Sequence, residues 1–213
     1  MKPFRHILSL GSACQATVQL RANFPTLKAG PFDWWVSPFE RMVAFLDATD
    51  WSLFEAGDLE PVQNRVSIAS RRHGFIFQHD FQRDAEGLVD MGRVEQHLPA
   101  LREKYAARLE RMDRQVRSGE PVLFLRWRRD HFMDWTRPPD DAPSTAGLDD
   151  LCQMVRRRWP QSDASFLFVN YDRRCDDPSA MFGHADSSQA ADWTGDAEAW
   201  RALFESHDVT LAD

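Results

Sequence analysis

The sequence has few cysteines, and none of them form a spaced pair. Its three cysteines, Cys14, Cys152 and Cys175, make no Cys-x-x-Cys motif. An odd number without such spacing is unlike a disulfide framework and suits a reducing compartment. No apolar run approaches the ~18 residues that a membrane span requires, and the first residues contain no apolar signal-peptide region. We therefore expect a cytoplasmic protein that does not enter a membrane.

Positively charged residues are outnumbered by acidic ones, 26 to 33. The formal net charge is −7 and the isoelectric point is near 5.5, which argues against a nonspecific nucleic-acid binder, because such proteins usually present a basic face. The sequence contains no His-x-x-x-His or Glu-rich metal motif, and Gly11 lacks the glycine partners of a phosphate-binding loop. We therefore expect no metal and no cofactor. The expected partner is a small-molecule, glycan or peptide substrate, and the sequence leaves the oligomeric state open.

The composition is that of an ordinary globular protein. Hydrophobic residues make up 43% of the chain and charged residues 28%, and the length lies within the usual range for one domain. We find no internal repeat and no linker. Residues 1–213 are therefore predicted to form a single α/β domain.

Strand-like and helical patterns alternate along the chain. Buried strands are predicted at residues 6–10, 122–127 and 166–170, and helices at 13–22, 37–48, 92–118, 148–159 and 197–206. The last two strands enclose a helix of about a dozen residues, which predicts a right-handed crossover between parallel neighbours. The expected fold is α/β, with a mostly parallel central sheet flanked by helices. A papain-like α+β fold is the alternative.

Three further segments give weaker signals. A short helix is predicted over residues 51–56, an extended segment over 66–81, and an irregular polar stretch over 175–195.

Cys14 is the residue with the clearest chemical potential. It follows a predicted strand and a Gly11-Ser12 turn, so it is placed in the first turn of a helix with Ser12 as the N-cap. Free backbone N–H groups and the helix dipole at such a position stabilise a thiolate and lower the thiol pKa. Amides near Gly11, Ser12 and Gln15 could also hold an oxyanion. The alternative is that Cys14 is a small buried core residue.

A cysteine nucleophile usually requires a base and a residue that orients the base. His79 is the first candidate base, because it ends a predicted strand, and His131 is the second. Asp33 and Asn170 are the candidate orienting residues. Asp80 is a weaker one, because it is adjacent to His79 and would point the other way on a strand.

Aromatic and basic residues near these positions could contact a ligand. Trp34 lies in an aromatic loop, Arg126 lies near the end of the strand at 122–127, and His131 follows that strand. We predict that these three residues bind substrate. If Cys14 is only a packing residue, the same aromatic loop and arginine predict a non-enzymatic domain that binds a glycan or an anion.

Several short motifs together resemble a known family. They are Ile7-Leu8-Ser9-Leu10-Gly11-Ser12-Ala13-Cys14-Gln15, Gly30-Pro31-Phe32-Asp33-Trp34, His79-Asp80-Phe81, and Tyr105 to Arg108 before the strand Val122 to Arg126. In this order they resemble a bacterial family of unknown function labelled "putative papain-like cysteine peptidase", over about residues 5 to 170. The resemblance implies that Cys14 and His79 act as a pair.

The sequence differs from papain itself. It has no Cys-Gly-Ser-Cys-Trp context, and Cys14 and His79 are separated by only 65 residues. The turn that ends in Cys14-Gln15 is also similar to the Gly-Asn-Cys-Gln turn of a capsular-polysaccharide biosynthesis family associated with acyl groups. The predicted function is therefore a thiol-dependent hydrolase or peptidase with a Cys14 nucleophile and a His79 base, and an acyltransferase of polysaccharide biosynthesis is an alternative.

Overall fold

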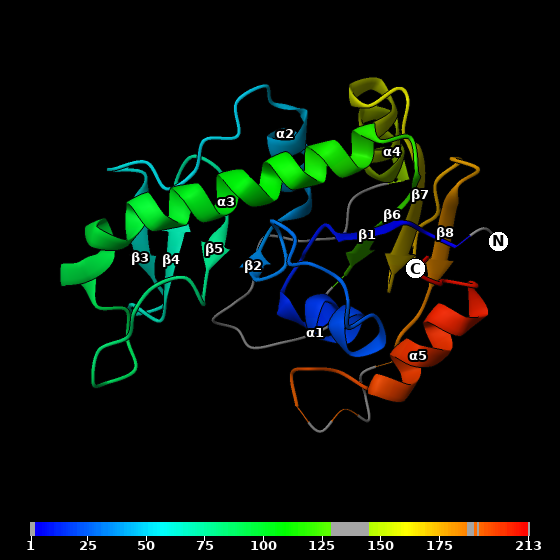
Figure 1. The fold of residues 1–213 in the computed structure, drawn as a ribbon. Helices are drawn as coiled ribbons and strands as arrows, with labels where there is room; N and C mark the ends of the chain where they lie inside the picture. Colours follow the sequence, from blue (N-terminus) through cyan, green and yellow to red (C-terminus); the bar gives the residue numbers. More distant parts are fainter. Residues whose placement is uncertain (1–2, 129–144, 187–189, 191, 213) are drawn as a thin grey trace.

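A parallel sheet forms one half of the protein. The computed structural model describes residues 3–128, 145–186, 190 and 192–212. Four strands pair in the order β1-β6-β7-β8, all of them parallel (Figure 1). Their bounds are β1 His6–Ser9, β6 Pro121–Trp127, β7 Asp163–Val169 and β8 Ala180–Gly183. The predicted α/β class is confirmed, and the carboxyl ends of these strands meet at one edge of the sheet.

Helices cover both faces of this sheet because its strands alternate between two apolar sets. Val122 and Phe124 of β6 belong to the cluster packed under α3 (Val94–Arg117) and α4 (Thr145–Arg158). Leu123 and Leu125 belong to the opposite cluster, which packs against α1 (Cys14–Asn23) and α5 (Ala197–Ser206). In Figure 1, α1 and α5 lie below the sheet, and α3 crosses above it. This layering is what a buried parallel sheet requires.

A second, antiparallel sheet continues the structure beyond α2 (Phe39–Asp47). Its strands pair in the order β2-β5-β4-β3. The bounds are β2 Trp35–Val36, β3 Leu59–Val62, β4 Ser67–Ser70 and β5 Ile76–Phe77. The segment at 66–81 is therefore two short strands, joined by a turn in which Gly74 has a φ of +68°. The long helix α3 follows the 3-10 turn η1 (Met91–Arg93) and spans both sheets (Figure 1).

Two sequence predictions about individual segments were wrong. Residues 51–56 form no helix, since Phe54 adopts a φ of +61° and packs its ring 4.6 Å from that of Phe77. The polar stretch 175–195 contains β8, which the pattern missed. All four β8 residues are only partly buried, because β8 is an edge strand, and its apolar run of three residues is short.

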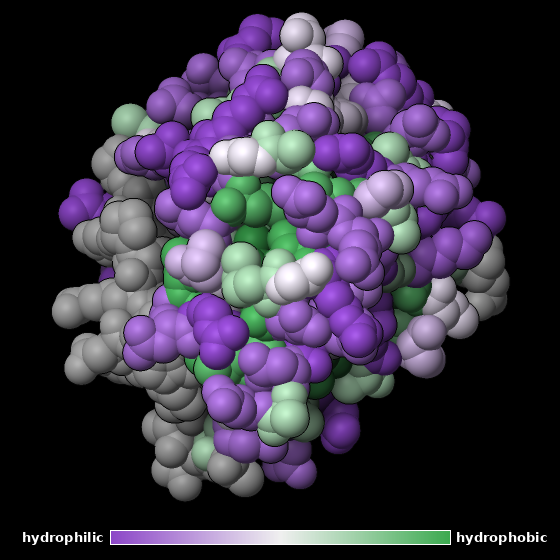
Figure 2. All heavy atoms as spheres, turned by 90° about the vertical axis from the view of Figure 1, so that its left-hand side faces the viewer, coloured by the Kyte–Doolittle hydropathy of each residue, from purple (hydrophilic) through white to green (hydrophobic). Residues whose placement is uncertain are grey.

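The core reaches the surface on the side of the antiparallel sheet. Figure 2 views the molecule from that side and shows mostly hydrophilic residues around a hollowed area of hydrophobic ones. At the opposite side the two ends of the chain meet, because Phe4 forms a parallel bridge with Leu211. None of the described helices is both long and apolar enough to cross a membrane.

Candidate active site

Cys14 is the first residue of α1, at the carboxyl edge of the parallel sheet. The turn that leads to it contains Gly11, whose φ is +84° and whose N–H donates to Ser9 Oγ at 3.1 Å. A Cβ atom at Gly11 would overlap the Ser37 hydroxyl, so the turn accepts no side chain there. The N-cap is Ala13, not the predicted Ser12, and its side chain makes no capping bond. Ser12 instead accepts a hydrogen bond through its carbonyl from Ser37 N, at 3.0 Å.

Arg126 fixes this turn from below. Its Nη1 donates to Leu10 O at 2.6 Å and to Ser37 Oγ at 3.1 Å, and its Nη2 donates to Ser37 O at 2.6 Å. The side chain is fully buried, with 0% of its surface exposed. The structure therefore places Arg126 in the interior, where it holds the turn before α1, and its contact with substrate stays a prediction.

Burial is the main influence on the pKa of the Cys14 thiol. Only 5% of the residue is exposed, and this burial raises the thiol pKa to about 11, with smaller increases from the charges of Asp80 and Asp33. The backbone N–H of Cys14 itself acts in the opposite direction. The lowered thiol pKa that the sequence predicted for this helix start is therefore wrong: desolvation outweighs the Cys14 N–H, and the thiol is neutral near pH 7.

His79 stands two residues beyond β5. Since Trp35 pairs with Phe77 in the antiparallel ladder, the register brings His79 opposite the segment that precedes β2. Its ring meets Trp34 edge to face, at 5.5 Å between centroids. Partial burial lowers the imidazole pKa, which the charge of Asp80 partly offsets. Within the described chain no hydrogen bond joins His79 to Cys14.

Asp33 holds the loop beside α1. Its carboxylate accepts the Gly30 N–H at 2.8 Å, and Arg21 Nη2 lies 3.5 Å away. Its carbonyl accepts the Thr17 hydroxyl at 2.5 Å, one turn along α1 from Cys14. Burial raises the carboxyl pKa, and the Gly30 amide and Arg21 lower it. Asp33 therefore ties the loop to α1, and no described contact joins it to His79.

Asp80 is the carboxylate whose charge reaches both the thiol and the imidazole. Its side chain is 2% exposed and lies 2.7 Å from Lys104 Nζ. The Tyr105 hydroxyl donates to it, at 2.9 Å from each oxygen. The sequence pattern ranked Asp80 below Asp33, because neighbouring residues of a strand point in opposite directions. That alternation does not apply to His79 and Asp80, since β5 ends at Phe77.

The remaining predicted residues lie in different surroundings. Asn170 follows β7, and its side chain exchanges two hydrogen bonds with the backbone of Ala185, so its amide secures the segment after β8. Gln15 is buried, and its amide fills the space beside Gly195. Trp34 is half-buried, with the Arg21 guanidinium 5.3 Å from its ring centroid. His131 lies outside the described residues.

The described residues include no group of three or more His, Cys, Asp or Glu side chains suited to hold a metal ion.

Comparison with known families gives a match over residues 5–173 to the one described as "Putative papain-like cysteine peptidase (DUF1796)". The chain belongs to this family. Neither the curated proteins nor the solved structures contain a match. The family match covers β1, Cys14, His79 and Asn170, and it ends before β8 and α5.

Proposed function

We propose that this protein is a thiol-dependent acyl-transfer enzyme in which Cys14 is the nucleophile and His79 the base. The observation that carries the proposal is the placement of Cys14 in the first turn of α1, with its own N–H acting on the sulfur. His79 belongs to the adjoining edge of the second sheet, and the charge of Asp80 acts on both groups. A nucleophile and a base beside the first turn of a helix form the arrangement that acyl transfer requires.

The protonation states favour a general-base mechanism. Burial raises the thiol pKa of Cys14 and lowers the imidazole pKa of His79, so both groups are neutral near pH 7. A preformed thiolate–imidazolium pair is therefore disfavoured in the free protein. The imidazole is instead ready to accept the thiol proton as the sulfur attacks.

The proposed step conserves atoms and charge. The Cys14 sulfur bonds to the carbonyl carbon of an ester, thioester or amide while the thiol proton passes to His79. The resulting oxyanion is held by the backbone N–H groups of Cys14 and Gln15 in the first turn of α1. Collapse breaks the bond to the leaving group, which takes the proton from His79 and leaves an S-acyl enzyme. Water, or the hydroxyl of an acceptor, then releases the acyl group.

Active-site acylation tests this proposal directly. With p-nitrophenyl acetate as the probe, we expect a burst of p-nitrophenol and an acetyl group on Cys14, located by peptide mass spectrometry. Cys14→Ala should abolish the burst, and His79→Gln should slow it by about 10²- to 10⁴-fold. Cys175→Ala is the matched control, because Cys175 is the more exposed free cysteine and lies far along the chain. A burst of unchanged rate in Cys14→Ala would sink the proposal and favour the non-enzymatic domain.

A further inference from the structure

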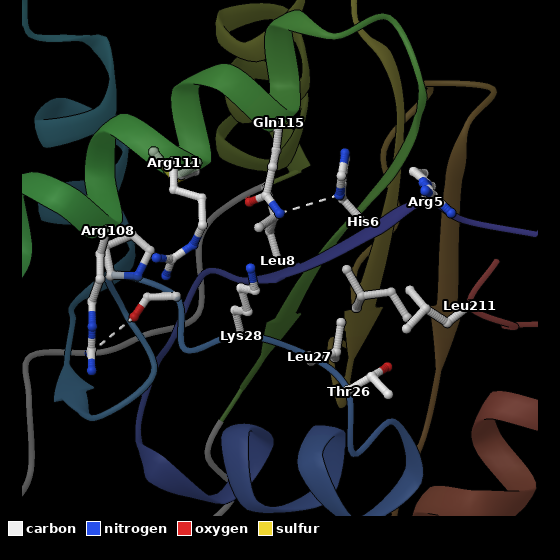
Figure 3. Close-up of a pocket in the computed structure, with 14 residues that line it drawn as sticks. Arg5, His6, Leu8, Thr26, Leu27, Lys28, Arg108, Arg111, Gln115 and Leu211 are labelled. Atoms are coloured by element: carbon white, nitrogen blue, oxygen red, sulfur yellow. Dashed lines mark hydrogen bonds between the residues drawn. The ribbon is translucent and has the colours of Figure 1, made fainter. Parts of the chain in front are cut away.

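A cavity lies at the other end of β1 from Cys14. It has a volume of about 380 Å³ and is enclosed by α3, the first half of β1 and the loop between α1 and β2 (Figure 3). Leu8, Leu27, Met112 and Leu211 contribute apolar surface to its lining. A cavity of this size fits a small organic molecule.

Three cations line this cavity without an acidic partner. They are Lys28 from the loop and Arg108 and Arg111 from α3, one helical turn apart. Among the described residues no carboxylate lies within ion-pair distance of any of the three. At the far end of the same cavity, Arg5 and His6 both lie against Glu120, at 3.7 and 3.1 Å. The charge of Asp33 acts on Arg108 and Arg111 from outside the cavity lining, and this carboxylate also faces Arg21. Three cations that share so little negative charge are unexpected in a chain with a net charge of −7.

The two arginines are held in place by the backbone. Arg108 Nη1 donates to Gly30 O at 3.3 Å, and Arg111 Nη2 donates to Ala29 O. Each guanidinium has five N–H donors, so these bonds leave most of them available. Burial and the neighbouring Arg108 charge lower the pKa of Arg111, and the charge of Asp33 offsets part of this effect. In Figure 3 the Arg111 and Lys28 side chains extend toward the same space between α3 and β1.

We propose that this cavity binds a small molecule that carries a phosphate group. Arg111 and Arg108 supply N–H donors in the planar geometry that phosphate oxygens accept, and Lys28 adds a third positive charge. A dianionic phosphate compensates three cations better than a monoanionic carboxylate or sulfate ester does. The apolar part of the ligand lies on Leu8, Leu27 and Met112. This proposal is independent of the chemistry assigned to Cys14.

Calorimetric titration with phenyl phosphate tests the site, with phenyl sulfate and benzoate as ligands of similar shape and lower charge. We expect saturable binding of phenyl phosphate, weaker binding of the other two, and loss of affinity as salt increases. Lys28→Gln and Arg111→Gln should each weaken binding by about tenfold or more, as expected for a lost charge-assisted hydrogen bond. Arg114→Gln is the matched control, because Arg114 lies on the same helix, pairs with Glu110 at 3.8 Å and does not line the cavity.

Four outcomes would overturn the proposal. The first two are the absence of saturable phenyl phosphate binding, and equal affinity for phenyl phosphate and benzoate. The third is unchanged affinity in both Lys28→Gln and Arg111→Gln. The fourth is sedimentation of the protein with phosphatidic-acid vesicles without any response to phenyl phosphate. Lys28 is exposed, so Lys28→Gln keeps the fold and gives a valid answer even if an arginine variant unfolds. Circular dichroism of each variant verifies this.

Discussion

The Trp34 indole meets the His79 imidazole edge to face, with 5.5 Å between ring centroids. The indole thereby removes part of the imidazole from water, and this desolvation is the main reason that the His79 pKa is lowered. Arg21 lies over the same indole, 5.3 Å from its centroid. Trp34 therefore connects a residue of α1 with a residue that follows β5.

Replacing Trp34 with alanine should raise the His79 pKa toward its ordinary value near 6.5. Water would then reach the imidazole and stabilise its charged form. An NMR titration of the His79 ring protons measures the shift, and the acid limb of the acylation rate should move upward in pH with it. His73 is an internal reference, because its lowered pKa comes from burial at a different place, beside Phe45 and Phe75. An unchanged His79 titration would show that Trp34 does not control the base.

Alkylation of the native protein by iodoacetamide should be slow at Cys14 near neutral pH and should accelerate up to pH about 11, its thiol pKa. The reason is that the thiolate is the reactive form, and burial delays its formation. Mass spectrometry of the labelled peptides gives the rate at each cysteine. Cys175, which is only partly buried, should be labelled first. A Cys14 rate that reaches its plateau below pH 8 would contradict the neutral-thiol mechanism.

Gly11→Ala should destabilise the protein by about 3 kcal/mol or more, because it combines an unfavourable positive φ with overlap against Ser37. Gly87→Ala is the matched control. Its φ is +78°, and a Cβ atom there meets nothing within 4 Å, so only the conformational cost of about 1 kcal/mol remains. Urea denaturation measures both free energies of unfolding. Equal losses in the two variants would refute the steric role of Gly11.

Arg126→Met should lower the free energy of unfolding by about 3–5 kcal/mol, because it leaves the carbonyls of Leu10 and Ser37 without the donors that reach them at 2.6 Å. Acylation at Cys14 should fall in the same variant even at temperatures where it remains folded, since the turn before α1 loses its support. Arg114→Met, at an exposed position of α3, should change stability by less than about 0.5 kcal/mol. A folded Arg126→Met variant with an unaltered acylation rate would show that the turn holds without it.

The sequence was sufficient for the parts of the fold that depend on continuous apolar patterns. The strands at β6 and β7 and the crossover helix α4 between them are buried on both sides, so their signal is strong. The helix at 197–206 was predicted with the bounds that α5 has. β8 was missed because an edge strand needs no apolar run.

The candidate site was harder to predict because it depends on pairing between short, distant segments. Cys14 is placed by local features, namely a strand, a glycine turn and a helix start. The position of His79 results from the pairing of the two-residue strands β2 and β5, which no periodicity reveals. Arg126 looked accessible at the end of a strand, yet its side chain points to the face where Ser37 and Leu10 accept its hydrogen bonds. The cavity proposed to bind phosphate likewise combines a loop with a helix. Its residues Lys28 and Arg108 are 80 positions apart in the sequence.

The proposed nucleophile and the proposed base follow strands of different sheets. Cys14 begins the helix that follows β1 of the parallel sheet, whereas His79 follows β5 of the antiparallel one. Neither sheet alone can therefore assemble the proposed pair, and reactivity becomes a reporter of how the two halves of the molecule are joined. During gradual denaturation, separation of the two sheets should stop acylation of Cys14 while the far-ultraviolet circular dichroism of the helices persists. The proposed activity should therefore be lost before the secondary structure, because it depends on the contact between the two sheets.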